Sequence, residues 1–126
     1  MVTAMRLSAI CCALATAMTL SGGEALAHAQ LVKADPRVGS TVKAAPARMW
    51  MKFSEVPRLM GTGVQLIGSK GPPILLQPLT ADPKDVRAFF APLPANLAPG
   101  RYQVRWRALS PDAHHTEGDF SFTVRP

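Results

Sequence analysis

Strict alternation of apolar and polar residues constrains this chain more than any other feature of its sequence. The stretch Arg48–Phe53 would place two methionines and a phenylalanine on one face of a strand and two basic residues and a tryptophan on the other. The residues after Gly100 and those in Phe120–Val124 repeat the pattern. A period of two is typical of half-buried β-strands. The predicted apolar faces consist of Met49, Met51 and Phe53, of Tyr102, Val104, Trp106 and Ala108, and of Phe120, Phe122 and Val124.

Shorter apolar stretches extend this β pattern over the rest of the chain. Val64–Ile67, Ile74–Leu76 and Val86–Ala91 are less regular strand candidates, and segments rich in proline and glycine separate them. About seven short strands at this spacing, without a helical stripe of useful length, predict an all-β fold, a single small antiparallel sandwich. The sequence shows no internal repeat, low-complexity tract or linker, so we expect one domain.

The first 27 residues have the organisation of an export signal. Arg6 makes the start positive, residues 7–20 are uncharged and mostly apolar, and the small residues Ala25-Leu26-Ala27 form a cleavage motif. The apolar run is shorter than the roughly 20 residues that a membrane-spanning helix needs. We therefore expect residues 1–27 to be a cleaved signal peptide. The overlapping motif Ala27-His28-Ala29 offers an alternative cut that would leave Gln30 first.

Cleavage after Ala27 would leave a small basic chain without cysteine. Both cysteines, Cys11 and Cys12, would leave with the signal peptide, so the remaining 99 residues must fold without a disulfide. These residues carry 13 basic and 7 acidic side chains, but the charges are scattered. An exported protein with scattered charge is not expected to have a nucleic-acid partner. We interpret its basic residues, including Arg101, Arg105 and Arg107, as a solvated surface.

A histidine would become the first residue of the exported chain, because His28 follows Ala27 directly. Such a residue offers two nitrogen donors, its α-amine and its imidazole. Asp112 and His114 lie two positions apart, so an extended backbone would direct both to one side. Nitrogen and oxygen donors in a tetragonal plane suit Cu(II), which also displaces the proton of an α-amine near neutral pH. The sequence therefore predicts a Cu(II) site wherever these two segments meet.

Simpler interpretations exist for the same residues. Alone, His28 would be an ordinary terminus and His114 an ordinary loop residue, and only their occurrence together with Asp112 favours a metal. An N-terminal histidine and a second histidine could also form the copper brace of a polysaccharide monooxygenase, but so small a chain offers no obvious substrate platform. We therefore expect no enzyme. A metal-free immunoglobulin-like binding module is the remaining alternative.

Five short motifs, each weak alone, are specific together. They are His28-Ala29-Gln30-Leu31 with Asp35-Pro36, Met51-Lys52-Phe53-Ser54-Glu55, the segment 100–106, Ser110-Pro111-Asp112-Ala113-His114, and the segment 118–124. With these motifs the chain resembles the CopC (PcoC-like) periplasmic copper-resistance proteins over nearly all of residues 28–126. The resemblance implies a Greek-key β-sandwich of immunoglobulin-like or cupredoxin-like form, located in the periplasm. It also implies a role in copper homeostasis, in which a monomer sequesters Cu(II) or exchanges it with an inner-membrane transporter or another periplasmic copper protein.

The resemblance also implies a ligand set. His28, Asp112 and His114 would bind one Cu(II) ion, and Glu55 would be an outer ligand or a supporting group. The family's usual Asp-Gly-His-Pro is altered here to Asp-Ala-His-His. Ala113 should be tolerated unless the backbone dihedrals of a glycine are needed. His115 either points away, as the period of two favours, or competes with His114 as the ligand.

Two further departures concern Glu55 and Cu(I). Val56 separates Glu55 from Pro57, whereas the family has proline directly after the glutamate, so Glu55 could be shifted relative to the metal. Some family members carry a methionine-rich loop that binds Cu(I), but the corresponding residues Gly68–Leu79 contain no methionine. Because soft thioether ligands select Cu(I), we do not expect Cu(I) binding there.

Overall fold

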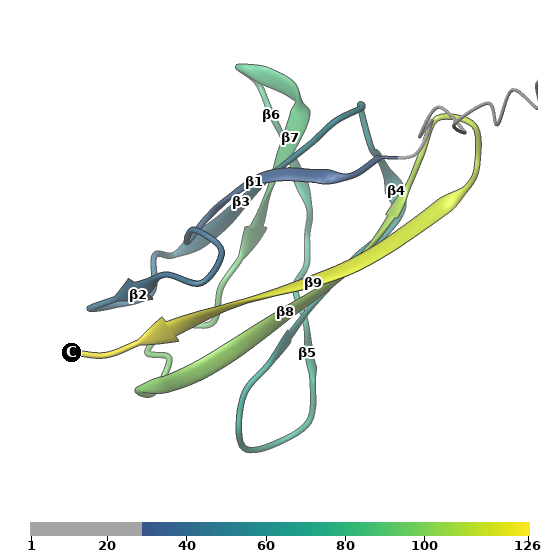
Figure 1. Ribbon diagram of the computed structural model, residues 1–126. Coiled ribbons are helices and arrows are strands. Elements are labelled where there is room, and N and C mark those ends of the chain that lie inside the picture. Colours follow the sequence, from purple (N-terminus) through teal and green to yellow (C-terminus); the bar gives the residue numbers. More distant parts are fainter. Residues whose placement is uncertain (1–28) are drawn as a thin grey trace, which may run out of the picture.

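Nine β-strands make up the regular structure of residues 29–126, the part of the chain that the computed structural model describes (Figure 1). The signal peptide expected at residues 1–27 and His28 lie outside the described residues. Between Ala29 and Pro126, no helix has the length and apolar character needed to cross a membrane. The strands are β1 (Leu31–Asp35), β2 (Thr41–Val42), β3 (Arg48–Phe53), β4 (Arg58–Ile67), β5 (Ile74–Leu75), β6 (Thr80–Asp82), β7 (Asp85–Pro92), β8 (Gly100–Leu109) and β9 (His115–Val124).

The strands form two sheets packed as a sandwich. One sheet has the order β1-β3-β7-β6 and the other the order β2-β9-β8-β4-β5. Between β1 and β9 the chain changes sheet between most consecutive strands and forms hairpins at β4–β5, β6–β7 and β8–β9, as in a Greek-key sandwich. The predicted β-sandwich is confirmed. Nine strands replace the expected seven, and the parallel pair β2–β9 is an exception to the expected antiparallel pairing.

The alternating faces predicted from the sequence form the core. Met49, Met51 and Phe53 of β3 are fully buried, and the apolar residues of β8 and β9 face them from the other sheet. Phe53 stacks on Phe89 with ring centroids 5.6 Å apart and meets Trp106 edge to face at 5.1 Å. Because aromatic pairs in these geometries add to the gain from apolar burial, these three rings tie the two sheets together.

Two carboxylates at the turn between β6 and β7 have a pKa below the ordinary value of 3.8. The Lys84 backbone N–H lowers the pKa of Asp82 most, and the Trp50 indole N–H, which donates to Asp82 Oδ2 at 2.8 Å, adds to the effect. For Asp85, the hydrogen bond from the Lys52 ammonium, 2.8 Å away, lowers the pKa most. Both carboxylates therefore favour the folded state most when they are ionised.

This arrangement predicts a loss of stability in acid. A carboxylate whose folded-state pKa is lowered contributes its full stabilisation above the unfolded pKa of about 3.8 and loses it as the pH falls through the folded pKa. The melting temperature should therefore fall below about pH 4. In thermal melts followed by circular dichroism, Asp82→Asn should reduce this pH dependence. A variant as acid-sensitive as the wild type would contradict the assignment.

Candidate metal site

Asp112 and His114 lie side by side in the loop that joins β8 to β9. Asp112 Oδ1 accepts a hydrogen bond from the His114 backbone N–H at 3.2 Å, and Asp112 Oδ2 lies 3.0 Å from His114 Nδ1. Both side chains remain accessible to solvent, at 42% and 68% exposure. The structure thus brings together an imidazole nitrogen and a carboxylate, as predicted, but through a turn and not through the extended backbone that the prediction assumed.

The contact between the two side chains has a consequence for ligation. An imidazole that donates a hydrogen bond from Nδ1 has Nε2 as its acceptor nitrogen, the atom through which such a histidine binds a metal. Metal-binding histidines usually donate their other ring N–H to a carboxylate or a carbonyl, which fixes the orientation of the ring. Asp112 can therefore orient His114 when the metal is on Nε2, whereas a metal on Nδ1 would have the Asp112 carboxylate beside it as a second donor.

The backbone of the loop is closed by its own hydrogen bonds and contains one left-handed residue. The Ser110 N–H donates to the His114 carbonyl at 2.8 Å, and the Ala113 N–H donates to the Ser110 carbonyl at 3.0 Å. Ala113 has a φ of +68°, a conformation that glycine adopts readily and that a Cβ disfavours. The glycine dihedrals that the family motif suggests are therefore adopted here by an alanine.

Replacing Ala113 with glycine should stabilise the protein. The left-handed conformation costs a residue with a Cβ about 1–2 kcal/mol, and the greater freedom of glycine in the unfolded chain offsets part of that gain. We expect Ala113→Gly to raise the free energy of unfolding by about 0.5–1 kcal/mol, measured by urea denaturation. Ala95→Gly, at an exposed position without a positive φ, is the matched control and should not stabilise. An Ala113→Gly variant less stable than the wild type would contradict the claim that Ala113 has a strained backbone.

Ala29, the first described residue of the chain, is hydrogen-bonded to one residue on each side of this loop. The Ala29 N–H donates to Ser110 Oγ at 2.9 Å, and the Thr116 hydroxyl donates to the Ala29 carbonyl. Figure 1 shows β1 beginning beside the turn between β8 and β9. Ala29 and the Asp112–His114 segment therefore lie at the same end of the sandwich, which the sequence alone could not show. No motif in the sequence indicated the roles of the Ser110 and Thr116 hydroxyls.

Glu55 and His115 take different places relative to this end. Glu55 follows Ser54, whose backbone N–H donates to the Gln30 carbonyl at 2.8 Å, so it lies next to the N-terminal segment. His115 begins β9 and precedes Thr116, whose hydroxyl contacts Ala29, so its side chain lies on the opposite face of the strand. This position agrees with a histidine that points away from the pair rather than replacing His114.

Within residues 29–126, no group of three or more histidine, cysteine, aspartate or glutamate side chains could hold a metal ion. Asp112 and His114 form a pair, and a complete site needs further donors. The third predicted ligand, His28, lies outside the described residues.

Comparison with known proteins identifies the fold family. The family model of the CopC domain matches residues 31–125. The chain belongs to the CopC family. It is 35% identical over 111 residues to copper resistance protein C of Escherichia coli, covering 80% of this chain and 84% of that protein. It is also 33% identical over 99 residues to protein YobA of E. coli K12, covering 79% and 80%.

A solved structure confirms the CopC fold. The crystal structure of CopC from Methylosinus trichosporium OB3b superimposes with a TM-score of 0.69 at 30% sequence identity. The match covers 79% of this chain and 95% of that chain. The match therefore extends over nearly all of the CopC structure.

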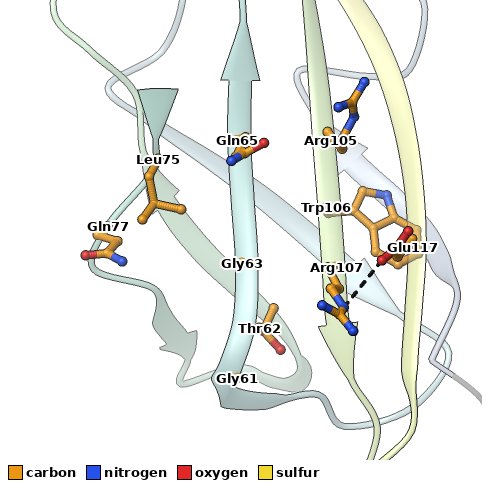
Figure 2. Close-up of a pocket in the computed structure, with 10 residues that line it drawn as sticks. All are labelled: Gly61, Thr62, Gly63, Gln65, Leu75, Gln77, Arg105, Trp106, Arg107 and Glu117. Carbon is orange, nitrogen blue, oxygen red and sulfur yellow. Dashed lines mark ion pairs between the residues drawn. The ribbon is translucent and has the colours of Figure 1, made fainter. Parts of the chain in front are cut away.

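A separate pocket lies on the outer face of this CopC sandwich, along β4, β5, β8 and β9 (Figure 2). Its volume is about 490 Å³, and its polar lining includes Gln65, Gln77 and Arg105. Arg107 and Glu117 form an ion pair at 3.4 Å across neighbouring strands. No histidine lines this pocket, so it does not extend the Asp112–His114 pair.

Proposed function

We propose that this chain is an exported periplasmic protein that binds one Cu(II) ion through His28, Asp112 and His114. The observation that carries the proposal is the position of Ala29, which is hydrogen-bonded to both ends of the loop that contains Asp112 and His114. Consecutive Cα atoms lie about 3.8 Å apart, so a terminal histidine joined to Ala29 starts close to that loop. Relatives named copper resistance protein C support copper as the metal.

The donor set fits Cu(II) better than Cu(I). An α-amine, two imidazoles and a carboxylate are nitrogen and oxygen donors, and Cu(II) prefers such donors in a tetragonal plane. Met60 is 90% exposed on β4, whereas Met49 and Met51 are buried in the core. These positions do not form a cluster of thioethers suited to Cu(I).

Copper binding without an enzymatic reaction fits a role in copper homeostasis. The protein would sequester Cu(II) in the periplasm or carry it to an inner-membrane transporter or another periplasmic copper protein. Asp112 and His114 are exposed at the end of the sandwich, where a partner can approach them. Exposure of the ligands supports transfer of the ion by direct contact between carrier and acceptor.

The test is a Cu(II) titration of protein that begins at His28, followed by electron paramagnetic resonance. We expect one equivalent of tightly bound copper with a type 2 spectrum and nitrogen hyperfine coupling. The absence of a tight site in this protein would contradict the proposal and would favour a metal-free binding module.

A pair of neighbouring histidines provides the matched variants. His114→Ala should weaken Cu(II) binding about 100-fold, equivalent to about 2.7 kcal/mol, because it removes a donor. His115→Ala should leave the affinity unchanged, because His115 lies on the other face of β9. Competition titration against a chelator of known affinity measures both. Equal losses of affinity, or a larger loss for His115→Ala, would contradict the assignment of His114 as the ligand.

A further inference from the structure

The backbone just before β1 is held by side-chain hydroxyls from three other parts of the chain. Ala29 donates to Ser110 Oγ and accepts from the Thr116 hydroxyl. Gln30 donates to Ser54 Oγ at 2.9 Å and accepts from the Ser54 N–H. All four backbone polar groups of two consecutive residues are therefore bonded before the first strand begins.

Burial makes these hydrogen bonds specific for one position of the chain. Ala29 and Ser110 are both fully buried. A buried N–H or carbonyl without a partner is strongly unfavourable, so a shift of the segment by one residue would replace satisfied groups with unsatisfied ones. The buried space at position 29 holds the methyl group of an alanine. It would not hold the longer side chain of Gln30. The hydroxyls thus set the register of the N-terminal segment as well as its location.

The two hydroxyls that hold Ala29 bracket the candidate metal site. Ser110 precedes the loop that contains Asp112 and His114, and Thr116 follows it. The Ser110 N–H also bonds the His114 carbonyl at 2.8 Å. The same two residues are therefore attached to the N-terminal segment and to the two ends of the loop.

We propose that Ser110 and Thr116 are positioning residues that hold the N-terminal segment in one register, so that residue 28 is presented to Asp112 and His114. The proposal rests on the proposed function, because it concerns the delivery of the His28 donors to the copper site. Neither hydroxyl is assigned as a ligand. Their contribution is to order the terminus before copper arrives, which reduces the ordering that binding requires.

Three variants separate a hydroxyl role from simple packing. Thr116→Val keeps the shape of the side chain and its strand preference but removes the hydroxyl, whereas Thr116→Ser keeps the hydroxyl and loses a methyl. Thr123→Val makes the same change at the far end of β9 and serves as the control. If the hydroxyl matters, serine rescues and valine does not. If packing matters, the order is reversed.

Two measurements on each protein provide the readouts. Loss of the hydroxyl should weaken Cu(II) binding about tenfold in Thr116→Val and in Ser110→Ala, as expected for groups that position ligands. In the metal-free protein, amide hydrogen exchange at Ala29 should accelerate at least about tenfold in Ser110→Ala. Thr116→Ser and Thr123→Val should match the wild type in copper affinity, and thermal melts confirm that each variant is folded.

The possible failures are distinguishable. If the wild type binds no Cu(II), the proposed function fails, whereas the exchange rate of Ala29 in metal-free protein still tests the hydrogen bonds. If the wild type binds Cu(II) and both hydroxyl-free variants bind it equally tightly, the positioning role is overturned and the function stands. Unchanged exchange at Ala29 in Ser110→Ala would also overturn the positioning role.

Discussion

One extra residue in front of His28 should weaken Cu(II) binding about a thousandfold, or about 4 kcal/mol. The extension converts the α-amine of His28 into an amide, which removes the chelate ring that the amine and imidazole form together. It should not disturb the fold, because Ala29 and the strands that follow keep their contacts. Competition titration with a chelator measures the affinity, and electron paramagnetic resonance should show fewer coupled nitrogens.

A matched control and the natural terminus complete this experiment. Adding one residue after Pro126, at the other end of the chain, lengthens the protein equally without altering the α-amine of His28 and should leave copper affinity unchanged. Mass spectrometry of the exported protein should give an N-terminus at His28. A start at Gln30, or an extended protein that binds copper as tightly as the wild type, would contradict chelation of copper by the α-amine and imidazole of His28.

The parts of the fold that could be predicted are those where one face of a long strand is buried. In β3 and β8 the alternation runs for six and ten residues, and burial follows it almost residue by residue. By contrast, β2 has two residues and β6 has three, which is too short for a period to be visible. In β1 a bulge between Leu31 and Lys33 breaks the alternation, so local pattern alone cannot define that strand.

The site was predictable in its residue types and only partly in its geometry. The expectation that Asp112 and His114 lie together is right, with 3.0 Å between them, but a turn brings them together and not the extended backbone from which it was argued. The left-handed Ala113 between them was not predictable from alanine, which rarely adopts a positive φ. The hydroxyls of Ser110 and Thr116 act through contacts more than 80 residues away along the chain, and no local pattern encodes such pairs.

Gly118→Ala should destabilise the sandwich by about 2 kcal/mol, which lowers the melting temperature of a domain of this size by roughly 10 °C. A Cβ at position 118 would lie 2.5 Å from Cζ2 of Trp106 and 2.8 Å from its Cε2. Figure 2 shows the indole ring reaching from β8 toward β9. The ring cannot move aside easily, because Trp106 is 6% exposed and packs edge to face on Phe53.

Gly63→Ala is the matched control for this clash. Gly63 lies on β4, on the other side of β8 from Gly118, and a Cβ there would meet nothing within 4 Å. Because alanine has less freedom than glycine in the unfolded chain, this variant should melt at or slightly above the wild-type temperature. Equal melting temperatures for the two variants would mean that the Trp106 ring can shift. The core of the sandwich would then be looser around its central aromatic cluster than the contacts among Phe53, Phe89 and Trp106 imply.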